Sequence, residues 1–517
     1  MNRLTLVLIL NLAWCGQPYG APPVKEIVFP VERFEVVGDS PLNAKETSRI
    51  LASFAGRTHS LGSLREVAKK LEQSIRERGY SFYRVTLHPQ TMESNAVVQL
   101  KVVAFRLEEI SVEGNRYFSK SNILASLPAL KIGTSPNNET LAQQIKVANY
   151  HPQKKLGLTF QQIDKPDAIG TKINVEDQSP HQFTVMMNTR GSQGTGDYRL
   201  SAGYQYSNLW GLDHILNVSY TTSPDHFDEV RQYGASYMLP IYPLRGWLSG
   251  YYARSDVDTG TVGGLFQVSG AGELGGVHYL QYLPRWRLYE HWLDLGWDDK
   301  LFDNKVIFGR VQDFGVDVRS RPFSLAYKGQ INWQSHRAGF EFGWAGNLDG
   351  GSDNTKAAYA GTRFGAKPDW DVLRYGAFWD MGLPGSWTWR HSFTGQYSSE
   401  PLIPAEQIGL GGLTTIRGYR EREVGGDSGH LYKTEIWTPQ WLPGLNFLGF
   451  YDQGHRELHN TQPGEKNTLW LRSTGLGARW QWKDQFTVSV DLAYAFDRGL
   501  QTKPGSGRVH AQMAYRF

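Results

Sequence analysis

The sequence has almost no cysteine, no long apolar run after its first residues and no excess of charge of one sign. Its one cysteine is Cys15, so a disulfide within the chain is excluded. No later segment approaches the roughly 18 continuous apolar residues of a membrane-spanning helix. Lysine and arginine total 54 against 50 acidic residues, without a block of like charge. Nucleic acid is therefore not expected as a partner.

Residues 1–20 have the features of a secretory signal peptide. One cation, Arg3, precedes an apolar run from Leu4 to Leu12, and cleavage is expected near Gly20. A lipoprotein signal would also use a cysteine here, but Trp14 is too bulky for the position before a lipidated cysteine. The mature chain is therefore expected to be exported and free of cysteine.

The sequence is instead rich in glycine and aromatic residues, with 56 glycines and 13% aromatics. Strands of a membrane β-barrel alternate apolar and polar side chains, so their mean hydropathy is low. This composition in an exported, cysteine-free chain favours a barrel. The length of 517 residues leaves room for further modules.

Residues 31–104 predict a small module with the order β-α-α-β-β. "VERFEVVGD" alternates, "LNAKETSRILASFAG" and "SLREVAKKLEQSIRERG" have helical periodicity, and "FYRVTLHPQ" and "AVVQLKVVAF" alternate again. The second helix is expected to open with a capping box from Ser63 to Glu66 and to stop at Gly79.

Residues 105–178 repeat this order. "RLEEISVEGN" matches the first strand, "SKSNILASLP" and "NNETLAQQIKVAN" are the helices, and "KLGLTFQQ" and "GTKINVEDQ" are the closing strands. Two tandem repeats of about 73 residues are therefore predicted.

From residue 180 to residue 517 the helical periodicity disappears. The final segment, "RVHAQMAYRF", places Val509 and Met513 on one face and His510 and Arg516 on the other. We count 16 such segments, which start near residues 181, 196, 213, 228, 245, 270, 288, 322, 336, 369, 386, 428, 445, 468, 485 and 507. About 21 residues per strand and turn leave room for a tilted membrane strand of about 9–11 residues.

These segments predict a 16-stranded antiparallel transmembrane β-barrel over residues 180–517. The even strand number and the aromatic C-terminal residue, Phe517, are typical of bacterial outer-membrane barrels. A soluble β-sandwich or propeller is the alternative. It is disfavoured because a polar face recurs on every strand of one long sheet.

One predicted loop is unusually rich in charge. "IRGYRERE", residues 416–423, carries three arginines and two glutamates within the long loop 399–427 between barrel strands 11 and 12. "GFYDQG", residues 449–454, follows in a later strand. Alternation places Leu448, Phe450 and Asp452 on one face of that strand.

The chain resembles the two-partner secretion transporters of the hemolysin-activator type, whose N-terminal modules are called POTRA domains. The resemblance rests on the two modules before a barrel, on "IRGYRE" in a long loop and on "GFYDQG" in a later strand. It also rests on two longer stretches, "MNTRGSQGTGDYRLSAGYQYSNLWGLDHILNVSY" at the start of the barrel and "LPALKIGTSPNNETLAQQIKVANYHP" in the second module. The resemblance covers essentially the whole mature chain. The same superfamily holds BamA-like insertases.

The resemblance implies that the loop folds back into the barrel lumen and that its arginine contacts inward-facing acidic groups. The loop motif is Ile416, Arg417, Gly418 and Tyr419, and the expected barrel-wall residues are Glu435, Phe450, Asp452 and Gly454. A guanidinium enclosed by a barrel wall must be paired. The neighbouring charges Arg420, Glu421, Arg422 and Glu423 are expected to be ordinary solvated loop charges.

The resemblance also implies a function: export of a large β-helical exoprotein with an N-terminal secretion domain, without ATP. The barrel would lie in outer-membrane lipid as a monomer, and the POTRA modules in the periplasm would capture the unfolded partner at a sheet edge. The expected partner-binding residues of the second module are Leu130, Gly133, Asn137, Leu141 and Asn149. No enzyme activity, metal or cofactor is expected.

Two other classes of function stay open. An insertase for other barrels shares the arginine loop but usually carries three or five modules. A porin or nutrient receptor would explain the barrel but neither the repeated modules nor the arginine loop.

Several motifs point to chemistry that their surroundings do not support. "GDSG", from Gly426 to Gly429, resembles a protease nucleophile stretch but lies in the long loop without a protease domain around it. "DVDTG", from Asp256 to Gly260, starts like a calcium loop and has Gln267 where the bidentate glutamate belongs.

Related transporters often carry an N-terminal plug helix. Only about ten residues separate the expected cleavage point from "FPVERFEV", too few for a helix and a linker. The sequence therefore predicts a pore closed by the arginine loop alone.

Overall fold

The computed structural model describes residues 27–90, 96–191, 195–257, 260–262, 266–268, 271–303, 307–308, 312–313 and 316–517. The predicted signal peptide, residues 1–20, lies outside this part of the chain, as does part of "DVDTG". Two compact units are present. The first ends at Arg106 and includes Lys165–Asp167, and the second comprises Leu107–Asp164 and Ala168–Phe517.

The first module has one strand more than the sequence predicts. In chain order its elements are β1 (Val28–Gly38), α1 (Ala44–Leu51), β2 (Arg57–Ser60), α2 (Leu61–Arg76), β3 (Tyr83–Leu87) and β4 (Ala96–Ala104). The sheet order is β2-β1-β4-β3. β2 was missed because its four residues, "RTHS", carry no apolar alternation.

The predicted capping box of α2 is wrong by one turn. The helix begins at Leu61, and the side chain of Ser60 accepts a hydrogen bond from the Ser63 N–H at 3.3 Å. A capping box occurs at α1 instead, between Asn43 and Glu46.

The second module has the predicted β-α-α-β-β order. Its elements are β5 (Arg106–Glu113), α3 (Lys120–Ala125), α4 (Asn138–Asn149), β6 (Lys154–Gln162) and β7 (Ala168–Asp177), in the sheet order β5-β7-β6. Helix α4 buries Leu141, Val147 and Ala148. These residues follow the helical spacing of one face.

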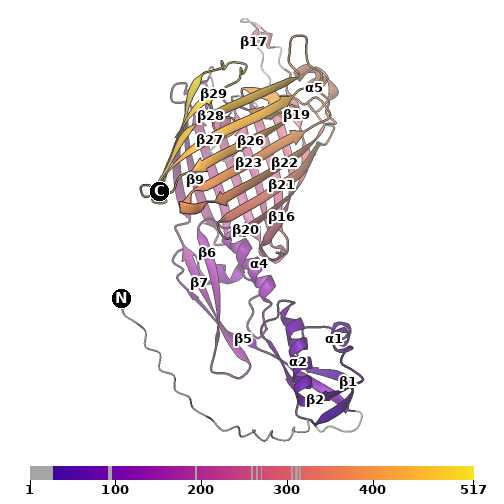
Figure 1. Cartoon of the computed structure of the whole chain (residues 1–517). Coiled ribbons are helices and arrows are strands. Elements are labelled where there is room, and N and C mark those ends of the chain that lie inside the picture. Colours follow the sequence, from indigo (N-terminus) through magenta and orange to yellow (C-terminus); the bar gives the residue numbers. More distant parts are fainter. Residues whose placement is uncertain are drawn as a thin grey trace, which may run out of the picture. The chain divides into compact units, whose positions relative to one another are not determined.

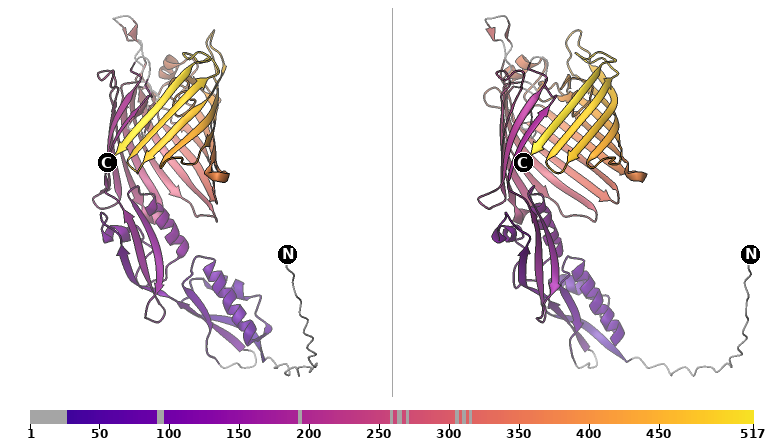
Figure 2. Two further views of the ribbon diagram at one scale, coloured as in Figure 1. Left: turned by 60° about the vertical axis from the view of Figure 1, so that its left-hand side comes forward. Right: turned by 90° about the vertical axis from the view of Figure 1, so that its left-hand side faces the viewer.

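The rest of the chain forms a closed antiparallel barrel of 16 wall strands, which confirms the predicted fold class (Figures 1 and 2). The wall elements are β8 (His181–Asn188), β9 (Arg199–Leu209), β10 (His214–Thr222), β11 (Gln232–Ile241), β12 (Gly246–Ser255), β15 (Gly272–Tyr282), β16 (Tyr289–Phe302), β19 (Val318–Ser320), β20 (Pro322–Trp333), β21 (His336–Asn347), β22 (Asp371–Gly382), β23 (Thr388–Tyr397), β26 (Ser428–Trp437), β27 (Leu445–Glu457), β28 (Thr468–Trp482), β29 (Phe486–Ala495) and β30 (Gly507–Arg516).

Two features make these elements one closed wall. β19 and β20 both pair with β16 and so count as a single strand interrupted at Arg321. The last strand, β30, pairs with the first, β8, and the backbones of Phe517 and Phe183 exchange hydrogen bonds of 2.9 and 3.0 Å. Figure 2 shows the C-terminus beside the first wall strands. Closure leaves the barrel without a free edge.

The two faces of each wall strand differ as the alternation predicts. On β29, Leu492 and Tyr494 point outward and are exposed, whereas Asp491, Ala493 and Ala495 are buried on the inner side. An apolar outer face and a mixed inner face suit lipid outside and a filled lumen inside. Among the described residues, no helix is long and apolar enough to cross a membrane.

The remaining elements lie in the connections. They are η1 (Tyr242–Leu244), β13 (Gly260–Val262), β14 (Phe266–Val268), β17 (Ile307–Phe308), β18 (Gln312–Asp313), α5 (Lys356–Thr362), η2 (Pro384–Ser386), β24 (Ile408–Leu410) and β25 (Val424–Gly426).

A buried ion pair joins the second module to the barrel. The Lys154 ammonium group donates to the Asp213 carboxylate at 2.5 Å and to Asn122 and Ser126 at 2.9 Å each. Both charged side chains are essentially inaccessible, at 0% and 1% exposure. The Tyr242 hydroxyl also donates to Asp213. Burial lowers the pKa of Lys154, although the Asp213 charge opposes that shift.

His151 lies buried at the same junction and forms two hydrogen bonds there in its neutral form. Its Nε2 donates to the Ser207 carbonyl at 2.6 Å, and its Nδ1 accepts from the Gln153 N–H at 3.2 Å. Burial lowers the pKa of His151 to about 4, since a second ring proton would meet the Gln153 donor. Two buried contacts therefore hold the second module to the barrel, the Lys154–Asp213 ion pair and the hydrogen bond from His151 to Ser207.

Replacing Lys154 with alanine should loosen this junction, because it leaves the Asp213 carboxylate buried without its cation at a cost of about 3–5 kcal/mol. We expect trypsin to cleave the second module of the purified protein about tenfold faster. The matched control is Lys172→Ala, which removes a solvent-exposed ion pair with Glu113 and should leave the cleavage rate unchanged. Equal rates for both variants would contradict the anchoring role.

Candidate functional site: the lumen loop

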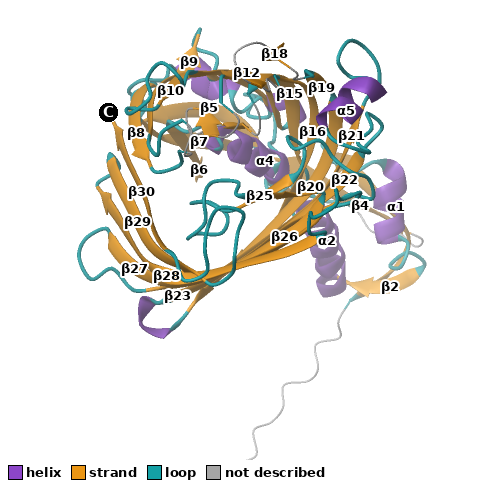
Figure 3. Ribbon diagram, turned by 90° about the horizontal axis from the view of Figure 1, so that it is seen from above, coloured by secondary structure: helices purple, strands orange, loops and turns teal. Residues whose placement is uncertain are grey.

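The loop between β23 and β26, residues 398–427, lies inside the ring of barrel strands (Figure 3). Within it, β24 and β25 pair with each other as a short antiparallel ladder. Gly411 and Gly412 adopt φ angles of 109° and 104°, and a Cβ atom on Gly411 would lie 2.4 Å from the Arg420 carbonyl oxygen. Glycine is therefore required where the loop turns back on itself.

Arg417 is at the centre of the loop's contacts with the wall. Its Nε donates to Oδ2 of Asp452 and its Nη2 donates to Oδ1, both at 2.7 Å. The backbone N–H of Arg417 donates to the same carboxylate at 3.1 Å. Its Nη1 lies 2.8 Å from Glu435, and its guanidinium carbon lies 3.5 Å from the ring centre of Phe450. The Arg417 side chain is 1% exposed. Bidentate pairing and ring contact fix both its position and its plane.

Further charges extend this contact into a network. Asp491 lies 3.7 Å from Arg417 and 2.8 Å from Arg479. The Lys433 ammonium group donates to the Thr414 carbonyl of the loop at 3.2 Å. Three cations, Arg417, Lys433 and Arg479, thus face three carboxylates, those of Glu435, Asp452 and Asp491. The equal numbers allow the network to lie in a secluded lumen without net charge.

The other motif residues hold the loop by shape. A Cβ atom on Gly454 would lie 2.4 Å from the Ile416 side chain, so the missing side chain of Gly454 makes room for that contact. Gly418 has a φ of 92°, and its N–H donates to His510 at 2.9 Å. The Tyr419 hydroxyl donates to the Arg472 carbonyl at 2.9 Å. Strands β27, β28 and β30 therefore all contact the four-residue motif.

The interpretation of the next charges as solvated is wrong for three of the four. Glu421 pairs with Arg190 at 2.8 Å, with both side chains at most 10% exposed. Arg422 donates to the carbonyls of Pro404 and Gln407 at 3.1 and 3.3 Å. These contacts have no local sequence signal, because Arg190 lies 231 positions from Glu421 and Pro404 and Gln407 lie 18 and 15 positions from Arg422.

Glu423 is the third of these charges and is also buried. It accepts hydrogen bonds from the N–H groups of Thr502 and Gln501 at 2.7 and 2.9 Å. The loop is therefore tied to the connection that follows β29 as well as to the wall.

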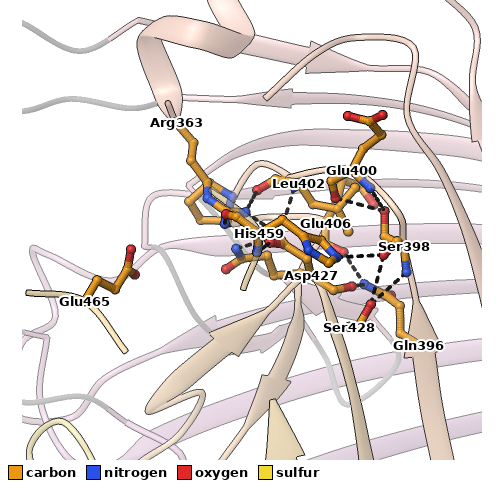
Figure 4. Close-up of polar contacts among 12 residues, drawn as sticks. Arg363, Gln396, Ser398, Glu400, Leu402, Glu406, Asp427, Ser428, His459 and Glu465 are labelled. Atoms are coloured by element: carbon orange, nitrogen blue, oxygen red, sulfur yellow. Dashed lines mark hydrogen bonds and ion pairs between the residues drawn. The ribbon is translucent and has the colours of Figure 1, made fainter. Parts of the chain in front are cut away.

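Two further buried carboxylates, those of Asp427 and Glu406, fix the base of the loop (Figure 4). Asp427 forms an ion pair with Arg363, which follows α5 in the chain. Its carboxylate also accepts hydrogen bonds from the N–H groups of Leu402 and His459 at 2.9 and 2.8 Å. Burial alone would raise the pKa of Asp427, but these hydrogen bonds lower it. Glu406 contacts Lys300 of the wall at 3.2 Å.

The "GDSG" stretch has no catalytic geometry. The Ser428 hydroxyl donates to the backbone carbonyl of Ser398 at 3.0 Å, and the His459 ring contacts the same carbonyl at 2.9 Å. Histidine and hydroxyl thus converge on a carbonyl and not on each other, as a nucleophile and its base would.

The structure places the five residues predicted for partner binding in the fold of the second module. Leu130 and Leu141 are buried. The Asn137 side chain caps α4 by accepting from the Thr140 N–H at 3.0 Å, and the Asn149 side chain bonds to the backbone of Leu156. The fifth, Gly133, has a φ of 80° and donates its N–H to the Leu107 carbonyl at 2.7 Å. All of these hydrogen bonds lie within the second module.

Beside the loop the lumen retains a cavity of about 520 Å³. Wall residues of β16 and β22, among them Lys300 and Arg374, line one side, and the loop residues from Ala405 to Gly411 line the other. Charged side chains of both signs belong to its lining, among them Glu341 and Glu406, together with apolar residues such as Ile408 and Leu410.

The comparisons with known proteins agree with this geometry. The family model of the haemolysin secretion/activation protein ShlB/FhaC/HecB matches residues 170–480, and that of the ShlB-type POTRA domain matches residues 29–104. The heme/hemopexin transporter protein HuxB of Haemophilus influenzae is 23% identical over 94% of this chain and 87% of its own. The outer membrane transporter CdiB of Dickeya dadantii is 23% identical over 88% of this chain and 81% of its own.

Solved structures show the same fold. CdiB from Escherichia coli gives a TM-score of 0.76 at 18% identity, over 97% of this chain and 93% of that chain. BamA from Haemophilus ducreyi lacking POTRA domains 1–3 gives a TM-score of 0.51 at 14% identity, over 95% and 100% of the two chains. With the family model matched over most of the barrel and a ShlB-type POTRA domain before it, the chain belongs to the haemolysin secretion/activation family ShlB/FhaC/HecB, a family of outer-membrane transporters and not of enzymes.

Proposed function

We propose that this protein exports one large partner protein through its barrel and that the lumen loop, anchored by Arg417, keeps the pore closed when no partner is present. The observation that carries the proposal is the neutral six-charge network in the lumen, in which the Arg417 side chain is 1% exposed. A loop held at its tip by ion pairs and bordered by a cavity with charged lining residues suits a pore that opens for a polypeptide.

Capture of the partner is proposed to start at a sheet edge of the POTRA modules. In the described part of the second module β6 lies at one end of the sheet order β5-β7-β6, and such an edge strand is where an extended chain can add to a sheet. Main-chain hydrogen bonds give affinity without demanding a particular sequence. The junction at Lys154 keeps this edge at a fixed place relative to the barrel.

The partner is proposed to be a large β-helical exoprotein with an N-terminal secretion domain. HuxB is named a heme/hemopexin transporter and CdiB an outer membrane transporter, which supports a macromolecular cargo. Folding of the cargo outside the cell would supply direction, since a folded product cannot return, and no nucleotide is needed. The barrel is proposed to act as a monomer.

Deletion of the gene in the native host tests the proposal most broadly. We expect mass spectrometry to show the loss of one large protein from the secreted and surface fractions, with every other outer-membrane barrel at its normal level. A fall in the levels of many other outer-membrane barrels would instead identify an insertase, the alternative function. The barrel of BamA has the same fold as this protein.

Replacing Arg417 with alanine should reduce export at least about tenfold while the barrel still assembles, because Asp452 and Glu435 lose their cation at a cost of about 3–5 kcal/mol. The same variant should raise conductance in planar bilayers, since the loop tip is no longer held. Secretion assays, barrel heat-modifiability and bilayer recordings measure the three quantities.

Arg420→Ala is the matched control, because Arg420 lies three residues away in the same loop and outside the six-charge network. It should leave export and conductance near their normal values. If Arg417→Ala exported normally, the anchored loop would have no part in the mechanism.

A further inference from the structure

Arg456, at the outer end of β27, is a buried cation that forms no ion pair with any residue the structure describes. Its side chain shares the inward face of Asp452 and Gly454, and the residue is 5% exposed. Its Nε and Nη1 atoms are buried and make no hydrogen bond within the part of the chain that the structure describes. A buried donor without an acceptor is costly, and a charged one more so.

The neighbouring carboxylates are engaged elsewhere. Asp427 already accepts from five donors, two of them on Arg363 and the others on Leu402, Gln407 and His459. Glu465 stands apart from the Asp427 cluster in Figure 4 and accepts from the Gln462 N–H at 3.2 Å. Within the described residues, Arg456 therefore has no ion pair, whereas Arg363 and Arg417 both do.

Arg456 lines a cavity of about 690 Å³ at the outer mouth of the barrel. The cavity is bounded by the loop of α5, the lumen loop and the connections that follow β27 and β29. Phe364 and Leu500 are 66% and 71% exposed beside it, and its charged lining comprises the cations Arg363, Arg456, Lys466 and Arg498 and the carboxylate of Glu465. A volume of this size accepts a side chain with its neighbours and exceeds what a small inorganic anion needs.

Arg456 lies on the lumen side of the barrel wall, and this position limits what can reach the cavity. On β27 the side chains of Leu448, Phe450 and Asp452 are buried inside the barrel, and Arg456 follows the same alternation. Phe447 points to the other side and is exposed. Lipid head groups around the barrel meet the outer side, so the occupant must come from the lumen or from the medium.

We propose that this cavity binds a carboxylate side chain, flanked by apolar residues, of the polypeptide that leaves the lumen. The source of the carboxylate rests on the proposed export function, whereas the binding chemistry does not. Nε and Nη1 of Arg456 are enclosed, so the carboxylate contacts the guanidinium at Nη2, and Phe364 and Leu500 contact the flanking apolar side chains. A cation and an apolar rim at the exit favour segments that carry an acidic residue between hydrophobic ones.

The test uses the purified full-length protein in detergent and two peptide probes, acetyl-Phe-Glu-Leu-amide and acetyl-Phe-Gln-Leu-amide. They differ only in the charged group, so their affinities isolate the carboxylate contact. We expect the Glu peptide to bind about tenfold more tightly in calorimetry, as a charge-assisted hydrogen bond to a buried arginine predicts. Arg456→Gln should abolish the difference.

Arg254→Gln is the control, because Arg254 is an exposed arginine of β12 that is 54% accessible and pairs at the surface. It should keep the tenfold preference. Equal binding of the two peptides to the unaltered protein, or a preference that survives Arg456→Gln, would overturn the proposal. Inorganic phosphate that binds as tightly as the Glu peptide and displaces it would show a general oxyanion site and overturn it too.

Arg456→Lys keeps the charge and guards against misfolding of the glutamine variant. It should retain part of the preference, and heat-modifiability should show assembled barrels for all variants. Because these measurements involve no export, they stand even if deletion of the gene shows that the protein exports nothing. In that case the peptide result would still establish the carboxylate site, and only the exported chain as its source would fail.

Discussion

The need to neutralise one guanidinium inside the barrel governs much of this structure. Arg417 lies in a lumen from which its side chain has almost no access to solvent. Its charge is balanced by carboxylates from three wall strands, β26, β27 and β29, and two further cations balance the surplus acid. A charge withdrawn from water is tolerable only when such partners are already in place.

Geometry and charge act together in this arrangement. The bidentate contact with Asp452 sets the position of the loop tip, and the Phe450 ring under the guanidinium sets its plane. Gly454 leaves space for Ile416, so the loop approaches the wall closely enough for the ion pair to form. At the loop base Asp427 fixes the chain again through Arg363. Between these two points, Glu421 and Glu423 hold the loop to Arg190 and to the connection that follows β29.

Much of the fold could be predicted from the sequence because period-two alternation and helical periodicity are local signals. The strands of the barrel and both modules follow from such patterns, and β2 was missed because its four residues carry none. The pairing of Arg417 with Asp452 came from a resemblance and not from spacing. Its geometry depends on residues 35 positions apart on facing elements.

Other members of the network had no sequence signal. Asp491 reads as a polar residue on an inward face, and His510 as one of several histidines in alternating strands. Glu421 and Glu423 look like loop charges until the lumen wall surrounds them. Only the closure of the barrel brings β8, β29 and β30 around the same loop, and closure is a property of the whole chain.

Hydrogen–deuterium exchange of the lumen loop, compared between the natural protein and Asp452→Asn, tests the anchoring most directly. The substitution keeps the size of the side chain and removes the charge that faces Arg417. If the ion pair holds the loop, exchange across residues 413–423 is slow in the natural protein and fast in the variant, with β26 and β27 still protected. Unchanged slow exchange in the loop of the variant would show that something other than this ion pair holds it.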